Sequence, residues 1–335
     1  MSPFSPQCAP AARPPARDRF PGRLTAAVED CALGGSTTRR PRRHLLLIAN
    51  PQSRRGREGL GAAKAALKEG GYSFETVPLD RDWKLGEQIH TRRHLVDAVA
   101  VAGGDGTLNA VAQPLIDTGL PLLILPTGSA NDLARTLGIP TDLARAVDLL
   151  NSGQIREIDV GIANGHAFFN VASIGLAALV TQLVHSKVKK LLGPAAYGLA
   201  ALQALTKVRP FTAHIRGAGW NIEVKTFQIS VGNGRYYGGG TPVEARAQID
   251  DGQLDLYSLE VSDLLRLLLI APKIRHGRQG LAAQVRVGAC TRFEVHTRRV
   301  HPVSLDGEIV TQTPVIFTIR PRAVRVLTPQ DTPRA

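Results

Sequence analysis

Short apolar runs alternate with stretches of helical period and with glycine-rich turns over the part of the chain that follows residue 43. A short apolar run that ends in a turn signal is typical of a buried strand. Strands that alternate with helices at this spacing predict βαβ units and a parallel sheet. The predicted strands are 44–49, 72–79, 97–102 and 121–126, and the predicted helices are 58–69, 108–118, a segment through Leu133, Ala134 and Leu137, and 141–152.

The pattern changes after residue 152, where strand-like segments follow one another closely enough for antiparallel pairing. Two helical inserts, at 174–208 and 262–275, interrupt them. This half of the chain therefore predicts a second, β-rich domain. Its predicted strands are 155–162, 167–172, 211–215, 223–231, 254–261, 284–288, 292–297 and 315–320.

Positive charge is concentrated in the first residues. The chain has 41 Lys and Arg against 28 Asp and Glu, a net charge of +13, which favours an anionic partner such as a nucleotide, a nucleic acid or a membrane surface. Residues 1–43 hold eight of the arginines and seven of the 22 prolines. They lack the apolar core of a secretory signal, and we interpret them as a disordered basic tail. No pattern of aromatic residues suited to base stacking runs through the arginines, so nucleic acid is not expected as a partner.

The apolar runs and the cysteines argue against a transmembrane protein and against a fold held by disulfides or by cysteine-bound zinc. The longest apolar run, 264–272, contains Arg266 and is about half of a membrane span, which predicts a soluble or peripheral protein. Cys8, Cys31 and Cys290 lie far apart without a CxxC pair, so a disulfide framework and a cysteine-based zinc site are both excluded. A reducing cytosol fits this composition.

The turn Gly103-Gly104-Asp105-Gly106-Thr107 lies between a predicted buried strand and a predicted helix. Glycines let the backbone approach phosphate oxygens, and a helix N-terminus favours their negative charge. Thr107 is expected to cap the helix while its hydroxyl faces the ligand. An aspartate among phosphates is explained by a divalent cation or by proton transfer. The alternative is a tight glycine turn with Asp and Thr as helix caps.

Two more turns are expected at the same edge of the sheet. Pro126-Thr127-Gly128-Ser129-Ala130-Asn131-Asp132 follows the fourth strand and Asn50-Pro51-Gln52-Ser53 follows the first. Asn131 and Asp132 suit a helix N-terminus, as caps or as part of a site. Because ligands of parallel α/β sheets bind beyond the carboxyl ends of the strands, the three turns are predicted to border one crevice.

Six ordered motifs together resemble the diacylglycerol kinase catalytic-domain family, and within it the soluble bacterial lipid kinases related to diacylglycerol and sphingosine kinases. The motifs are NPxS at 50–53, GGDGTLN at 103–109, PTGSANDLAR at 126–135, NGRYYGGG at 233–240, IDDGQLD at 249–255 and SLDGE at 304–308. The resemblance covers about 44–328. It implies an α/β ATP-binding domain at 44–152 (parallel sheet with flanking helices, NAD kinase-like), a β-rich lipid-substrate domain at 153–314 (antiparallel β-sandwich), and C-terminal strands at 315–330 that return to the first domain.

The resemblance also implies roles for individual residues. The catalytic residues would be Asp306 and Glu308, one of which is the base that takes the proton of the lipid hydroxyl. Mg²⁺ would be held by Asp251 and by the backbone carbonyls of Gln248 and Gln253. The ATP-binding residues would be Asn50, Pro51, Gln52, Ser53, Arg54, Thr76, Gly103, Gly104, Asp105, Gly106, Thr107, Leu108, Asn109, Ala110 and Ser129.

Local sequence alone leaves Asp251-Gly252 and Asp306-Gly307 open to a simpler interpretation, because Asp-Gly is an ordinary hairpin turn. Two positions depart from the family: Arg54 replaces the usual glycine, and Ala110 stands where an acidic residue is common. An NAD kinase and a lipid- or nucleotide-binding protein without turnover therefore stay as alternatives to an ATP-dependent lipid kinase.

Apolar stretches with basic ends in the two inserts suit docking on anionic lipid, although helices that pack on the sheet would have the same pattern. We expect a cytoplasmic protein that associates peripherally with the inner face of the membrane, where its lipid substrate lies. The strand edges of the β-rich domain offer a surface for a homodimer.

Overall fold

The computed structural model describes most of the chain after residue 42. Residues 1–42 of the predicted tail at 1–43 lie outside the described residues, as do residues 186–207 of the predicted insert at 174–208 and the whole of the predicted insert at 262–275. The described ranges are 43–50, 54–79, 85–185, 208–234, 236–237, 241–242, 248–260 and 285–330.

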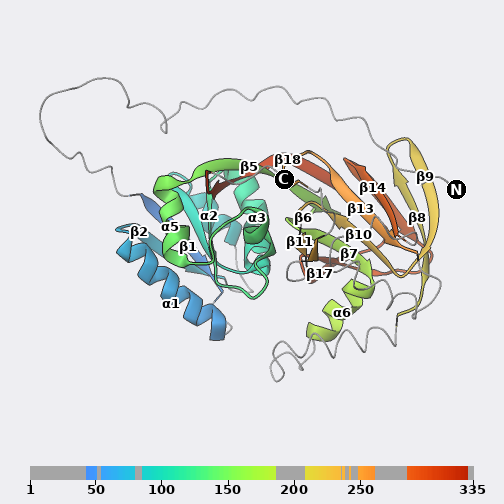
Figure 1. Ribbon diagram of the computed structural model, residues 1–335, viewed down its shortest axis with the longest axis horizontal. Coiled ribbons are helices and arrows are strands. Elements are labelled where there is room, and N and C mark those ends of the chain that lie inside the picture. The colour runs from blue at the N-terminus through green and yellow to red at the C-terminus, as the bar shows by residue number, and fades with distance from the viewer. Residues whose placement is uncertain are drawn as a thin grey trace, which may run out of the picture.

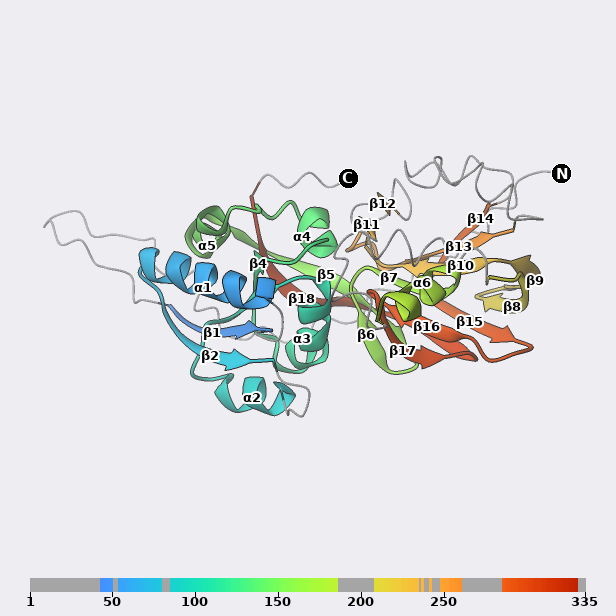
Figure 2. The same ribbon diagram turned by 90° about the horizontal axis from the view of Figure 1, so that it is seen from below.

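The first domain is built on a parallel sheet with the strand order β2-β1-β3-β4. Helices α1 and α5 contact each other, and so do α2 and α3, and Figure 2 shows these two pairs on opposite faces of the sheet. The strands are β1 (His44–Ala49), β2 (Ser73–Pro78), β3 (Ala98–Gly103) and β4 (Leu122–Pro126), and the helices are α1 (Arg54–Glu69), α2 (Leu85–Arg92), α3 (Asp105–Thr118), α4 (Asp132–Thr136) and α5 (Leu143–Ser152).

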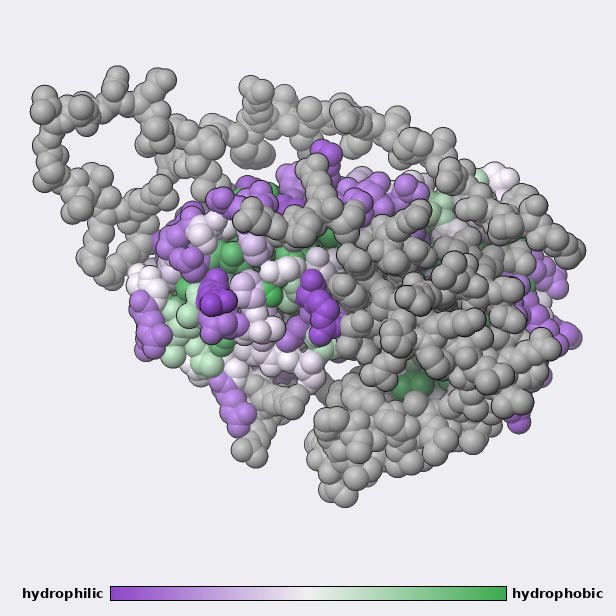
Figure 3. All heavy atoms as spheres, in the orientation of Figure 1, coloured by the Kyte–Doolittle hydropathy of each residue, from purple (hydrophilic) through white to green (hydrophobic). Residues whose placement is uncertain are grey.

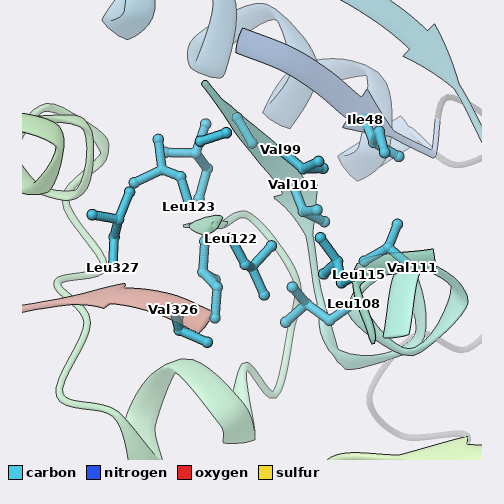
Figure 4. Packing of buried hydrophobic residues seen from close by; sticks show 14 of the residues in the cluster. Ile48, Val99, Val101, Leu108, Val111, Leu115, Leu122, Leu123, Val326 and Leu327 are labelled. Carbon is cyan, nitrogen blue, oxygen red and sulfur yellow. The ribbon is translucent and has the colours of Figure 1, made fainter. Parts of the chain in front are cut away.

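The inner strands β1, β3 and β4 are almost entirely apolar because helices cover both of their faces, whereas the edge strand β2 holds Ser73, Glu75 and Thr76. In β3, Val99 and Val101 point toward the helix α3 side, where they meet Leu108, Val111 and Leu115 (Figure 4). All five side chains are buried. This packing fixes the start of α3 directly beyond the end of β3, which is where the glycine turn lies.

The second domain is a β-sandwich. A six-stranded sheet of order β14-β13-β10-β7-β16-β17 shares an apolar core that includes Phe168, Phe293 and Phe317 with strands β18, β15, β8 and β9. Its elements are β5 (Gln154–Ala163), β6 (His166–Phe168), β7 (Val171–Gly175), α6 (Leu176–His185), β8 (Phe211–Gly217), β9 (Trp220–Thr226), β10 (Gln228–Gly232), β11 (Tyr236–Tyr237), β12 (Thr241–Pro242), β13 (Leu254–Leu259), β14 (Val285–Cys290), β15 (Arg292–Thr297), β16 (Pro302–Leu305), β17 (Glu308–Gln312) and β18 (Val315–Thr328).

Strands β5 and β18 join the two domains (Figure 1). The long strand β18 pairs with β15 at one end and with β4 at the other, through Val326 and Leu122, and β5 runs antiparallel beside it. The parallel sheet and one layer of the sandwich therefore form a single ten-stranded sheet. Two separate apolar clusters still mark two domains.

The fold class predicted from the sequence is confirmed, and the differences lie at element boundaries. Helices α1 and α3 begin four and three residues earlier than predicted, at Arg54 and Asp105, while α2, β16 and β17 were not predicted. The segments 167–172 and 223–231 were each predicted as one strand, which is wrong. In both places the chain passes from one sheet of the sandwich to the other, so each segment forms two strands.

Hydrophilic side chains cover much of the first domain on the face seen in Figure 3, as expected for the solvent side of amphipathic helices. Within the described ranges, no helix combines the length and the apolar character needed to cross a membrane.

Candidate functional site

Strands β1, β3 and β4 are parallel neighbours and therefore end at one edge of the sheet. The turns after β3 and β4 touch. A Cβ added to Gly128 would lie 2.3 Å from the Cα of Gly104, so no side chain fits between them. The amide of Thr127 donates to the carbonyl of Gly103 at 3.2 Å. The sheet thus brings the two glycine turns into one surface, as predicted.

Helix α3 presents its N-terminus at this surface. Gly104 is the N-cap residue and provides no side-chain cap. The prediction that Thr107 caps the helix is wrong, because its side chain folds back over Gly103, where an added Cβ would lie 2.5 Å from Thr107 Oγ1. The positive end of a helix beside a backbone without side chains is an arrangement that binds phosphate.

Asp105 caps the neighbouring helix α4. Its two carboxylate oxygens accept hydrogen bonds from the backbone amides of Asp132 and Leu133 at 3.1 and 3.0 Å. Asn131 does not cap α4 with its side chain, which instead closes the turn by hydrogen bonds to the backbone of Gly128. Oδ1 of Asp105 also accepts a hydrogen bond at 3.2 Å from Nδ2 of Asn170, a residue of the second domain.

Asp306 lies in the two-residue turn between β16 and β17. Positive φ angles of 46° at Asp306 and 86° at Gly307 are those of a type I′ hairpin turn. The carboxylate accepts three backbone hydrogen bonds, from Phe169 at 2.7 Å and from Asn170 and Val171 at 2.9 Å each. Burial raises the pKa of Asp306 to about 7, although the three amide donors act in the opposite direction, and the charge of Asp105 raises it further.

Glu308 lies beside the glycine turn of the first domain. A Cβ added to Gly106 would be 3.2 Å from Oε1 of Glu308, so the absence of a side chain at Gly106 leaves room for this carboxylate. The hairpin of the second domain therefore brings Asp306 and Glu308 against the first turn of α3. Asp105, Asp306 and Glu308, which are far apart in the sequence, meet where the two domains face each other.

The DDG turn forms a separate acidic region. Burial raises the pKa of Asp251 to about 6 against the effect of backbone donors, and the charges of Asp159 and Asp250 add to the rise. Burial likewise raises the pKa of Asp159, whose oxygens accept hydrogen bonds from the backbone amides of Gly252 and Arg322 at 2.6 and 2.7 Å. Arg156 forms an ion pair with Asp250 at 2.9 Å.

This region suits a hard divalent cation through its donor set. Asp251 offers a carboxylate, and the predicted ligands Gln248 and Gln253 offer backbone carbonyls, which are the oxygen donors that Mg²⁺ takes. A cation would also relieve the excess of negative charge. Within the described part of the chain, no group of three or more His, Cys, Asp or Glu side chains is arranged to hold a metal.

Other predicted site residues take varied positions. Asn50 directly follows β1, whereas Pro51, Gln52 and Ser53 lie outside the described residues, and Arg54 opens α1. Thr76 lies within the edge strand β2, two residues before its end. Leu108 is buried in the core, so only its backbone can face a ligand. Asn109 continues α3, and Ala110 and Ser129 are exposed.

Sequence reasoning missed Asn170, Asn233 and Asp159. Asn233 is buried and donates from Nδ2 to the carbonyls of Asp159 and Phe169 at 3.0 and 2.8 Å. Asn233 opens the NGRYYGGG motif, which could have indicated it. Asn170 and Asp159 lie within strand-like segments that gave no signal of a polar role.

Comparison with known proteins gives a consistent result. Residues 44–163 match the model of the diacylglycerol kinase catalytic domain, and residues 170–328 match the YegS C-terminal NAD kinase beta sandwich-like domain. A protein of Pseudomonas fluorescens named "Probable lipid kinase YegS-like" is 32% identical over 305 residues, which cover 87% of this chain and 97% of the relative. The "Diacylglycerol kinase" of Bacillus subtilis is 29% identical over 296 residues, covering 85% and 96%.

Solved structures with a similar fold include diacylglycerol kinases. A crystal structure of a diacylglycerol kinase from Bacillus anthracis superimposes with a TM-score of 0.66 at 21% identity and covers 86% of this chain and 97% of the other. The match of both domains and of nearly the whole length of a relative at 32% identity shows that the chain belongs to the diacylglycerol kinase catalytic-domain family of lipid kinases.

Proposed function

We propose that this protein is an ATP-dependent lipid kinase that transfers the γ-phosphoryl group of ATP to the hydroxyl of a lipid such as diacylglycerol and that requires Mg²⁺. One observation carries the proposal: the hairpin carboxylates Asp306 and Glu308 lie against the glycine turn at the N-terminus of α3. Phosphoryl transfer to an alcohol needs a phosphate-binding surface and a base within reach of each other.

ATP would bind along the edge of the parallel sheet, with its phosphates over Gly104 and the first turn of α3. The contact between Gly104 and Gly128 keeps side chains out of this surface, so backbone amides can approach the phosphate oxygens. The positive end of α3 would then stabilise the charge that develops on the transferred group.

Asp306 suits the role of base. A carboxylate has about four acceptor positions. Three of them accept amide hydrogen bonds, which leaves one on Oδ2 for the proton of the acceptor hydroxyl. Because the pKa of Asp306 is raised to about 7, the carboxylate is basic enough to take a proton and is still partly ionised at neutral pH. We assign the proton transfer to Asp306 and place Glu308, beside Gly106, next to the phosphates.

Mg²⁺ would be held by Asp251 and by the carbonyls of Gln248 and Gln253. When bound there, it would supply positive charge to the acidic region of Asp159, Asp250 and Asp251. Asp159 links this turn to the bulge of β18, since it accepts hydrogen bonds from Gly252 and Arg322. A bound cation would therefore also stiffen the strand pair that joins the domains.

The lipid would approach from the side of α6. This helix contacts β7, β16 and β17, so it borders the hairpin that carries Asp306. Leu176, Leu179 and Val180 of α6 are apolar and only half-buried. These features support peripheral association with a membrane, which we place at its inner face. We propose no nucleic-acid partner, and a homodimer would pair through edge strands of the sandwich such as β17.

Transfer of radiolabelled γ-phosphate to a panel of diacylglycerol, sphingoid, phosphatidylglycerol and NAD acceptors tests the proposal. Labelled lipid, formed only with Mg²⁺ present, is the expected result. Label in NAD alone would make the chain an NAD kinase. ATP binding without transfer to any acceptor would indicate a binding protein without turnover and would overturn the kinase assignment.

A further inference from the structure

Residues 168–170 link β6 to β7, where the chain passes from the ten-stranded sheet of the sandwich to the six-stranded sheet. Phe168 packs into the core of the sandwich and Phe169 into the core of the first domain. Asn170 follows, and it contacts two partly buried carboxylates of the site, those of Asp105 and Asp306. Two large aromatic anchors that point into different cores hold the backbone of Asn170 in place.

Asn170 contacts both carboxylates at once. Its backbone amide donates to Oδ1 of Asp306 at 2.9 Å, and its side-chain Nδ2 donates to Oδ1 of Asp105 at 3.2 Å. Asp105 belongs to the glycine turn of the first domain and Asp306 to the hairpin of the second. A single residue thus ties the predicted phosphate-binding turn to the predicted base.

The presence of an asparagine at position 170 is not explained by a contribution of its side chain to the stability of the fold. Asn170 is 3% exposed, yet its Oδ1 has no hydrogen-bond partner among the described residues. Turning the amide over would lose the hydrogen bond to Asp105, because it would place Oδ1 against that carboxylate. A buried carbonyl without a partner is destabilising, and such groups in native structures call for an explanation.

The unpartnered oxygen lies beside a glycine. A Cβ added to Gly234 would be 3.2 Å from Oδ1 of Asn170, and the amides of Asn233 and Gly234 both donate to the carbonyl of Asn170, at 2.8 and 3.1 Å. The start of the NGRYYGGG motif therefore wraps around Asn170. It fixes the backbone from one side while the phenylalanines fix it from the other.

We propose that Asn170 is a positioning residue of this kinase site, which sets the separation of Asp105 and Asp306 across the domain junction at a cost to stability. This inference rests on the proposed function. The Asn170 side chain would hold the first turn of α3 at a fixed position relative to the β16–β17 hairpin. The base Asp306 would then be correctly placed for both the acceptor hydroxyl and the phosphates.

Two variants test the role. Asn170→Ala removes the bond to Asp105 and the unpartnered oxygen together. It should lower kcat at least 30-fold, while the Kd for ATP stays within threefold and the Tm stays within about 3 °C of the wild type or rises. Asn170→Asp keeps the size but puts a carboxylate against Asp105, so it should also move the acidic limb of the pH–rate profile to higher pH. Asn221→Ala, at an exposed position of β9, is the control and should change none of these values.

The outcomes separate the inference from the function on which it rests. An active wild type with kcat for Asn170→Ala within threefold would overturn the inference and leave the kinase assignment intact. A joint fall of kcat and Tm, without a shift of the pH–rate limb in Asn170→Asp, would make Asn170 merely structural. If the wild type phosphorylates no acceptor, the pH dependence of the unfolding free energy, measured without substrate, tests the inference. A transition displaced to higher pH in Asn170→Asp supports the link between Asp105 and Asp306 through Asn170, and an unchanged transition overturns it.

Discussion

Replacing Asp306 by Asn tests the proposed base and its surroundings together. The variant keeps one carbonyl oxygen for the amides of Asn170 and Val171, but it turns an NH₂ group toward the amide of Phe169, which loses its acceptor. An unsatisfied buried amide costs about 1–3 kcal/mol, independent of pH. The variant also removes an ionisable group whose pKa is raised to about 7. Transfer should be abolished, while ATP binding persists.

The removed charge has a stability effect of known sign. In the unfolded chain the aspartate has a pKa of about 3.9, so the folded protein binds its proton more tightly. The native state is then favoured at low pH and loses stability as the pH rises toward 7. A shift of roughly three pKa units corresponds to about 4 kcal/mol in full, of which about 2.5 kcal/mol falls between pH 5 and pH 8. The Asn variant lacks this loss.

Urea unfolding of both proteins at pH 5, 6, 7 and 8 measures the effect. The difference in unfolding free energy, wild type minus Asp306→Asn, should fall by about 2.5 kcal/mol across this range. Taking the difference cancels the other titrating groups, such as Asp251 and Asp159. Asp117→Asn, at an exposed site, controls for the substitution itself. Parallel curves for wild type and variant would refute the raised pKa of Asp306, and with it the reason for assigning it as the base.

Three further predictions concern the rest of the site. Gly128→Ala places a methyl group 2.3 Å from the Cα of Gly104 and should weaken ATP binding at least tenfold, as measured by calorimetry. The control Gly61→Ala, which has open space around the added methyl group, should leave ATP affinity unchanged; equal ATP affinity of the two variants would contradict the proposed phosphate surface. Asp251→Asn should abolish the rise in Tm that Mg²⁺ gives the wild type, and a retained rise would place the cation elsewhere. Deletion of residues 1–43 should leave kcat and the KM for ATP unchanged, and loss of activity would make the tail part of the enzyme.

Local patterns predicted those features that depend on few neighbours. The inner parallel strands β1, β3 and β4 were found because both faces of each strand are covered, which makes these strands almost entirely apolar. The division at 167–172 was not found, because both halves of the segment are buried and only their partners differ. Asn170 was not predicted as a site residue, because its proposed role depends on Asp105 and Asp306. These two residues are distant from it in the sequence and are brought together only by the fold.

The two interpretations of Asp306-Gly307, a hairpin turn and a catalytic motif, are not alternatives. A type I′ turn requires a positive φ at both central residues, and aspartate and glycine tolerate it. In this turn the backbone amide of Asp306 donates to the carbonyl of Val171 at 3.0 Å, which directs the carboxylate onto the amides of residues 169–171. Those amides hold the charge that burial disfavours. The same dipeptide thus closes the hairpin and creates the environment of the proposed base. A substitution such as Asp306→Asn should therefore change both the stability of the hairpin and the transfer activity, and unfolding and transfer measurements on this variant test both effects.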